Sequence, residues 1–212
     1  MAPRVTTDPA TPPAPEPIRP AATVILWREG QEGHQILMGQ RGAGAVFMPS
    51  KYVFPGGGVD PQDHAGPAPA LTAACRTRLG RDCPADAPTP ETLARAALRE
   101  LHEETGLRPA PKAALRFVFR AITPPGRPRR FDARFFLVPA TGMTGDAETF
   151  RDATDELSHL HWIGLAEARA LDLPFITEVV LAEVTALLTT AADPPGVPFF
   201  DNSGPIPTFR RL

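Results

Sequence analysis

The sequence predicts one α/β (α+β) domain, in which strands and a few helices pack in layers around a core. Two patterns along the chain support this class. Short apolar runs separated by turn residues predict strands, and apolar residues at helical spacing predict helices. With 212 residues, of which 42% are hydrophobic and 22% charged, the chain can bury a substantial core.

The strands are expected to be short and to begin with a hairpin. Residues 22–27 and 35–40 are apolar runs on either side of a polar turn at 29–33, which is typical of two antiparallel strands. A third strand at 52–54 runs into the loop Pro55-Gly56-Gly57-Gly58, where the backbone can approach a ligand closely. Further strands are expected at 115–122, 134–138 and 157–163, and helices at 91–106, 165–171 and 175–189.

Clusters of proline indicate where the chain is irregular. Residues 1–19 are expected to form a disordered Pro-rich arm, because this composition buries too little apolar surface to offset the entropy of ordering. The domain itself is expected at 20–192, with a Pro-rich insertion at about 61–88 that contains one or two helical turns near 70–78.

A C-terminal tail is expected at 193–212. Its residues 197–200 are apolar enough to pack on the domain or on a second copy of the chain, so a homodimer is one expectation.

Composition argues against several classes of partner. The formal net charge of −2 lacks the concentrated positive field that nucleic acid or an anionic membrane requires. No apolar run approaches the roughly 20 residues of a membrane-spanning helix. The N-terminal residues lack the apolar core of a secretory signal, so a cytoplasmic location is expected. Cys75 and Cys83 are too few for a zinc site and are expected to be reduced thiols.

The helix at 91–106 has clear start and stop signals. Thr89 can cap it, Pro90 suits its first turn, and Glu91 places negative charge near the positive end of the helix dipole. Gly106 is placed to end the helix in a left-handed cap. This helix is therefore the best specified element of the chain.

The same helix carries three carboxylates on one side. Glu100, Glu103 and Glu104 lie at spacings of three and four, so their side chains share a face. Such crowding is unfavourable unless a cation lies among them, and oxygen ligands at this density suit Mg²⁺ or Mn²⁺. Arg99 can offset or orient one carboxylate. The alternative is an ordinary solvated acidic face.

These residues resemble a known motif. Arg99-Glu100-Leu101-His102-Glu103-Glu104-Thr105-Gly106-Leu107 is similar to the R-E-U-x-E-E-x-G-U core of the Nudix box, and Glu91 satisfies the Glu that the pattern separates from its Arg by seven residues. Phe54-Pro55-Gly56-Gly57 resembles the P-G-G at the family's strand end.

The resemblance includes one departure from the pattern. The family places five residues between its Gly and its Glu, whereas Ala85 stands at that distance before Glu91. If Gly57 is the family Gly, an insertion of 28 residues separates the two halves (91 − 57 − 1 = 33, less five). A loop of this length costs little closure entropy. It bears on which substrate the protein takes and not on the type of reaction.

The resemblance implies a Nudix-type α/β/α sandwich, with a mixed sheet between helices, and a metal-dependent hydrolase of nucleoside diphosphates linked to another moiety. It implies that Glu100 and Glu104 are metal ligands, that Glu103 is a further ligand or acts through a metal water, and that the Gly57 carbonyl is a backbone ligand. Mg²⁺ or Mn²⁺ would neutralise the phosphoryl oxygens and activate water, while a carboxylate removes its proton.

Other candidates lie in loops. Some family members carry a further Glu on the loop before a late strand that contains Trp, and Glu156 precedes Trp162 by six residues. Glu156 is therefore a candidate ligand or base, the alternative being a solvated loop together with Asp152 and Asp155.

Arginines are the candidates for phosphate binding, because a planar guanidinium suits bidentate recognition. Arg41 follows the second expected strand, and Arg127, Arg129 and Arg130 lie in a turn rich in proline. An ordinary exposed basic turn is the alternative for the last three.

The loops around Arg41 and residues 122–132 resemble the branch related to coenzyme A diphosphohydrolases, which implies coenzyme A or acyl-coenzyme A as substrate. ADP-ribose or another nucleoside diphosphate sugar is the alternative substrate. A Nudix-fold binding module without catalysis is the alternative of another class, and the three intact carboxylates argue against it.

Overall fold

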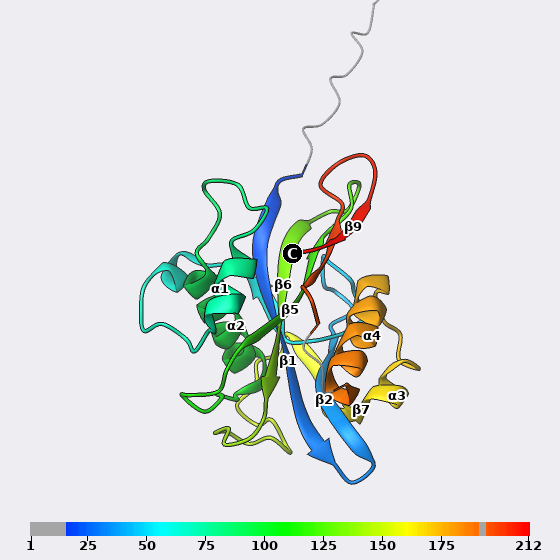
Figure 1. Ribbon diagram of the computed structural model, residues 1–212. Helices are drawn as coiled ribbons and strands as arrows, with labels where there is room; N and C mark the ends of the chain where they lie inside the picture. Colours follow the sequence, from blue (N-terminus) through cyan, green and yellow to red (C-terminus); the bar gives the residue numbers. More distant parts are fainter. Residues whose placement is uncertain (1–15, 191–193) are drawn as a thin grey trace, which may run out of the picture.

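A mixed β-sheet forms the centre of the structure, a computed structural model that describes residues 16–190 and 194–212 (Figure 1). Within these residues the sheet has nine strands in the order β3-β2-β1-β6-β5-β8-β9, with β4 paired to β1 and β7 to β2. The strands are β1 (Ile18–Gly30), β2 (Gly33–Arg41), β3 (Tyr52–Val53), β4 (Gly56–Gly58), β5 (Arg116–Ile122), β6 (Arg130–Pro139), β7 (Leu157–Gly164), β8 (Pro198–Asp201) and β9 (Thr208–Arg211).

Helices cover both faces of this sheet, so the structure confirms the expected α/β/α sandwich. Helices α1 (Ala73–Leu79) and α2 (Pro90–Thr105) lie on one side, and α3 (Leu165–Ala168) and α4 (Phe175–Thr189) lie on the other (Figure 1). Two apolar cores result, one under α2 and one under α4. None of the helices that the structure describes is long and apolar enough to span a membrane.

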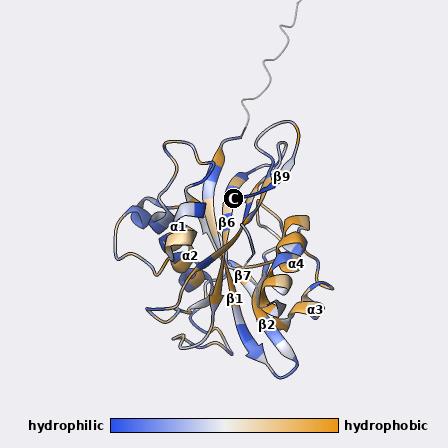
Figure 2. Ribbon diagram, viewed as in Figure 1, coloured by the Kyte–Doolittle hydropathy of each residue, from blue (hydrophilic) through white to orange (hydrophobic). Residues whose placement is uncertain are grey.

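Strand β1 contributes to both cores. Val24 and Leu26 belong to the core on the α2 side, whereas Ile25 belongs to the core on the α4 side, and all three are fully buried. This burial explains why the segment is an unbroken apolar run, as in strands covered on both faces. Hydrophobic residues accordingly follow the middle strands in Figure 2, while the tip of the β1–β2 hairpin is hydrophilic. Because β1 pairs antiparallel with β2 and parallel with β6, the sheet is mixed.

The C-terminal residues are part of the sheet, which corrects the expected tail at 193–212. Strand β8 pairs parallel with β5, and β9 pairs antiparallel with β8. Val197 and Phe199 are 2% and 1% exposed, so the apolar stretch at 197–200 packs on its own domain. The homodimer stays a prediction that this stretch no longer supports.

The insertion at 61–88 is an ordered layer of the domain. It contains a 3-10 helix, η1 (Pro61–His64), and α1, which confirms the helical turns expected near 70–78. Cys75 and Leu79 from α1 are buried in the core on the α2 side. The first 15 residues of the expected Pro-rich arm lie outside the described residues, and its last two, Ile18 and Arg19, already belong to β1.

Candidate active site

Helix α2 confirms the start and stop read from the sequence. The Thr89 hydroxyl accepts a hydrogen bond from the Thr92 amide at 3.2 Å, and Gly106 ends the helix in the left-handed region with a φ of 74°. Leu93 and Leu101 are fully buried against the sheet. The helix is therefore fixed in rotation, and its last two turns present Glu100 and Glu104 toward β4.

The Gly56–Gly58 segment, expected as a loop, is a short strand that pairs antiparallel with β1. It approaches α2 so closely that a Cβ at Gly57 would lie 2.4 Å from Glu100 Oε1. The Gly56 amide donates a hydrogen bond to Glu104 Oε2 at 2.7 Å. Backbone and carboxylates can share this space only because Gly57 has no side chain.

Glu104 is the most deeply buried of the three helix carboxylates. It is 1% exposed, and its Oε1 atom is buried with no hydrogen-bond partner among the described residues. Burial raises the pKa of Glu104 to about 8, although the Gly56 hydrogen bond opposes the shift. Burial also raises the pKa of Glu100, against the lowering effect of Arg99. Both carboxyls are therefore poised to bind a proton or a cation.

Arg99 contacts two of the three carboxylates of the cluster formed by Glu100, Glu103 and Glu104. Its Nη1 donates to Glu100 Oε1 at 2.8 Å and to Glu103 Oε2 at 2.9 Å. Burial opposes its charge, but hydrogen bonds to Asp63 and Glu100 outweigh burial and raise the pKa of Arg99. Arg99 therefore remains a cation that orients two carboxylates.

Asp63 was missed by the sequence analysis. It is 3% exposed and accepts two hydrogen bonds from Arg99, at 3.0 Å each from Nε and Nη2. Arg99 Nη2 also donates to the Gly58 carbonyl at 2.9 Å. Asp63 lies in η1, which therefore contacts the carboxylates Glu100 and Glu103 of α2 through Arg99.

The position of Asp63 corrects the assignment of Glu91. Five residues separate Gly57 from Asp63, which is the spacing that the Nudix pattern gives to its Glu. Glu91 pairs instead with Arg76 of α1 at 2.7 Å, and its side chain is 28% exposed. The extra 28 residues therefore follow Asp63 (99 − 63 − 1 = 35, less seven). The spacing from Gly57 was a usable signal, obscured by an Asp in place of Glu.

Strand pairing brings Glu156 and Arg41 beside the helix. Arg41 ends β2 and pairs with Leu157 of β7, and its Nη2 lies 3.1 Å from Glu156 Oε1. The loop before β7 is tied to α2, because the Thr154 amide donates to the Glu103 carbonyl at 3.1 Å.

Arg41 and Glu156 line a cavity of about 520 Å³, whereas Arg99, Glu103 and Glu104 are not among its lining residues. Its lining includes five of the residues singled out from the sequence, which are Gly57, Glu100, Glu156, Arg41 and Arg129. Arg19 also lines it, although the sequence analysis placed this residue in a disordered arm. Phe47 and Phe131 also line it and form an apolar wall, with their rings edge to face and 5.2 Å apart.

Arg127 and Arg130 do not belong to this lining. Arg130 is 6% exposed and donates to the carbonyls of Thr123 and Asn202, at 3.0 and 2.7 Å. Successive residues of a strand point to opposite faces, so Arg130 points away from the cavity while its neighbour Phe131 lines it. Arg130 thus has a structural role that the basic turn did not reveal, and Arg127 is exposed.

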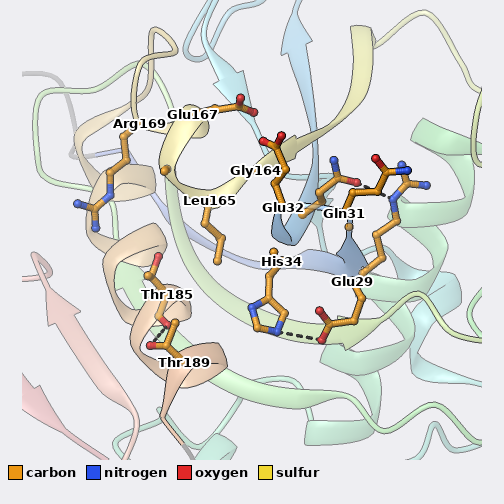
Figure 3. A pocket seen from close by; sticks show the side chains of 15 residues that line it. Glu29, Gln31, Glu32, His34, Gly164, Leu165, Glu167, Arg169, Thr185 and Thr189 are labelled. Carbon is orange, nitrogen blue, oxygen red and sulfur yellow. Dashed lines mark hydrogen bonds and ion pairs between the residues drawn. The ribbon is translucent and has the colours of Figure 1, made fainter.

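A second, more open cavity of about 1220 Å³ lies between the β1–β2 hairpin, α3 and α4 (Figure 3). It is lined by polar side chains such as Glu32, Glu167 and Thr185. Within this lining, Glu29 Oε1 lies 3.0 Å from His34 Nε2. None of the residues of the carboxylate cluster lines it. The smaller cavity is therefore the candidate active site.

The carboxylates of Glu100, Glu103 and Glu104 contact other groups of the protein and do not converge on a common point. Across residues 16–190 and 194–212, no group of three or more His, Cys, Asp or Glu side chains is already drawn together to hold a metal ion. Glu103 turns to Arg99 with its side chain 48% exposed, while Glu104 turns inward to Gly56. The three carboxylates thus share the end of α2 but face different partners.

Comparison with known proteins agrees with this geometry. The chain matches the NUDIX domain family over residues 17–184. It is similar to the crystal structure of a NUDIX hydrolase from Alicyclobacillus acidocaldarius, with 26% identity and a TM-score of 0.59 over 82% of this chain and 93% of that one. No curated protein matches the chain.

Two more distant structures share the fold. The MutT protein of Methanosarcina mazei Go1 is 15% identical with a TM-score of 0.54, over 82% of this chain and 98% of that one. The NUDIX domain of Shewanella oneidensis NrtR, complexed with ADP ribose, is 15% identical with a TM-score of 0.52, over 84% and 94%. From its fold, its helix α2 and the extent of the family match, the chain belongs to the Nudix family and is a diphosphate hydrolase.

Proposed function

We propose that this Nudix hydrolase uses Mg²⁺ or Mn²⁺ held by Glu100 and Glu104, with Glu103 and the Gly57 carbonyl as further ligands. The observation that carries this proposal is the buried, unpartnered Oε1 of Glu104. A buried acceptor without a partner is costly, and a cation between β4 and α2 would satisfy it. Carboxylate and carbonyl oxygens are the ligands that Mg²⁺ prefers.

The charges around the site also favour a cation. Five carboxylates (Asp63, Glu100, Glu103, Glu104 and Glu156) face two guanidiniums (Arg41 and Arg99), which leaves a net charge of −3 when all are ionised (2 − 5). Like charges this close raise one another's free energy, and this repulsion adds to the burial that is the main cause of the raised pKa values of Glu100 and Glu104. Divalent cations would offset that repulsion.

The chain's own residues supply the remaining parts of the mechanism. A divalent ion, when bound, neutralises phosphoryl oxygens and acidifies water. Arg99 keeps Glu100 and Glu103 in orientation. Glu156, with its side chain 53% exposed in the cavity wall, is open to water and accepts the proton of the attacking water.

The basic and the apolar residues that line the cavity favour coenzyme A or acyl-coenzyme A as the substrate. Arg19, Arg41 and Arg129 supply more positive charge than a bridging diphosphate needs, and they suit a ligand with an additional phosphate. Phe47 and Phe131 suit a long, largely uncharged arm. Cleavage would give 3′,5′-ADP and a phosphopantetheine.

ADP-ribose is the second candidate substrate. The observation that favours it is the NrtR domain of the same fold, whose structure contains ADP ribose. Arg41 could bind its diphosphate, but its polar ribose would not pack against the apolar wall of Phe47 and Phe131.

Product identification separates these candidates. The protein is incubated with Mg²⁺ or Mn²⁺ and a set of diphosphate compounds, and the products are resolved by mass spectrometry. The proposal predicts 3′,5′-ADP from coenzyme A, whereas AMP from ADP-ribose alone would identify the second candidate. A Glu103→Gln protein that kept full turnover would contradict the metal role of Glu103, whereas a wild type that cleaved none of the compounds would favour the binding-module alternative.

A further inference from the structure

The Arg41 side chain is weakly held for a residue at the wall of an active site. Its Nη2 contacts Glu156 at 3.1 Å, while its Nε is buried and has no hydrogen-bond partner in the part of the chain that the structure describes. The side chain is 20% exposed and that of Glu156 is 53% exposed. A single contact to a half-exposed carboxylate is a weak interaction, and a buried N–H group without a partner favours any ligand that can accept from it.

The backbone of Arg41, by contrast, is held firmly. Its amide donates to the Lys51 carbonyl at 2.9 Å, and its carbonyl accepts from the Ser50 amide at 3.1 Å. Its pairing with Leu157 in β7 fixes it next to Glu156. The side chain can therefore change partners while its Cα stays in place.

Both members of the pair face the reaction space. Arg41 and Glu156 line the same cavity as Gly57 and Glu100. Their charges also act on the Glu104 carboxyl, where Glu156 raises the pKa and Arg41 lowers it. A diphosphate in this cavity would offer Arg41 two oxygens in the fork geometry that a guanidinium matches best.

We infer that Arg41 is a positioning residue that exchanges partners during the reaction. It restrains Glu156 before substrate binds, and it turns its Nε and Nη groups to phosphoryl oxygens when a diphosphate enters, so that Glu156 is released toward the attacking water. This inference rests on the proposed function and adds substrate-dependent control of the base.

The exchange predicts a specific pattern of binding. The probe is methylenediphosphonate, a diphosphate whose bridging oxygen is replaced by carbon, and its affinity is measured calorimetrically with excess Mg²⁺. Because Glu156 competes with the probe for Arg41, Glu156→Gln should bind the probe at least threefold more tightly than the wild type. That gain should disappear in an Arg41→Gln background. Asp155→Asn, which removes a neighbouring exposed carboxylate, should bind within twofold of the wild type.

A lysine at position 41 provides a second measurement that does not depend on the glutamine variant folding. Arg41→Lys can still pair with Glu156 but cannot form a fork on a diphosphate, so it should bind the probe at least threefold more weakly. On a cleaved substrate, Arg41→Lys should raise KM more than it lowers kcat, whereas Glu156→Gln should lower kcat without raising KM.

Two results would overturn the exchange. In one, Glu156→Gln binds the probe no more tightly than the wild type, as a metal ligand or a structural partner would. In the other, the gain persists in the Arg41→Gln background, which would be a general effect of charge. If the wild type cleaves a diphosphate and either of these results is found in the variants, this inference alone fails. If the wild type neither cleaves a diphosphate nor binds the probe, the proposed function fails as well.

Discussion

Arg99 and Asp63 form a part-buried, bidentate ion pair that joins η1 to helix α2, with both contacts at 3.0 Å. The same guanidinium contacts Glu100 and Glu103. Asp63 is therefore coupled through Arg99 to the orientation of Glu100 and Glu103.

Asp63→Asn should impair both folding and turnover. Weakening a buried pair leaves the Arg99 charge undercompensated, which costs about 2–5 kcal/mol of unfolding free energy, and loss of orientation should lower kcat about 10-fold or more. Urea denaturation and steady-state kinetics measure the two effects. Glu91→Gln is the matched control, because its pair with Arg76 is partly exposed and should change stability by less than about 1 kcal/mol. Equal effects of the two variants would restore Glu91 as the partner in the motif.

Gly57→Ala should abolish most activity. The added Cβ would lie 2.4 Å from Glu100 Oε1, so the strand or the carboxylate must move, and a displacement of about 1 Å can lower kcat/KM about 100-fold. Gly58→Ala is the control, since a Cβ there meets nothing within 4 Å and should leave kcat/KM within about twofold. Equal activity of the two alanine variants would show that Gly57 does not set the position of Glu100.

Glu104 should make the metal-free protein less stable as pH rises. Its pKa is raised from 4.5 to about 8 in the folded protein, so the unfolded chain releases this proton first. The stabilising contribution is complete below pH 4.5 and is lost up to pH 8, on the order of 1 kcal/mol per pH unit at most. Glu104→Gln should remove this slope and be the more stable protein at pH 8 in EDTA. Parallel stability curves for the two proteins in chemical denaturation would contradict the assignment.

Arg129 and Arg130 should separate binding from folding. Arg129 lines the cavity and is exposed, so Arg129→Gln should raise KM about 10-fold with stability unchanged within about 0.5 kcal/mol. Arg130→Gln leaves the part-buried Thr123 carbonyl and the buried Asn202 carbonyl short of a donor, which should lower stability by about 1–3 kcal/mol and change KM less than twofold. The reverse pattern in kinetics and thermal unfolding would place Arg130 in the site.

The sequence predicted those elements that carry strong local signals. Helix α2 has a capping hydroxyl, a continuous apolar stripe and a terminal glycine, and its bounds agree with the prediction within one residue. The β1–β2 hairpin was evident from two apolar runs and a polar turn. Strands β8 and β9 were missed because each has four residues, too few for a pattern to emerge from a stretch rich in proline.

The site was predicted only as far as local spacing reaches. Glu100 and Gly57 could be linked through the motif, and the structure places them in contact range. The role of Asp63 depends on how the insertion folds back on α2, and the burial of Arg130 depends on strands that come later in the chain. Contacts between segments far apart in sequence decide such roles, and local pattern does not encode them.

Manganese binding tests the central claim most directly, because it requires no knowledge of the substrate. The free ion is followed by electron paramagnetic resonance as Mn²⁺ is titrated into the wild type and into Glu104→Gln at pH 8. The account predicts that the wild type binds Mn²⁺ and that Glu104→Gln binds it at least 10-fold more weakly. Equal affinity in the two proteins would contradict a metal site between Gly57 and the carboxylates of α2.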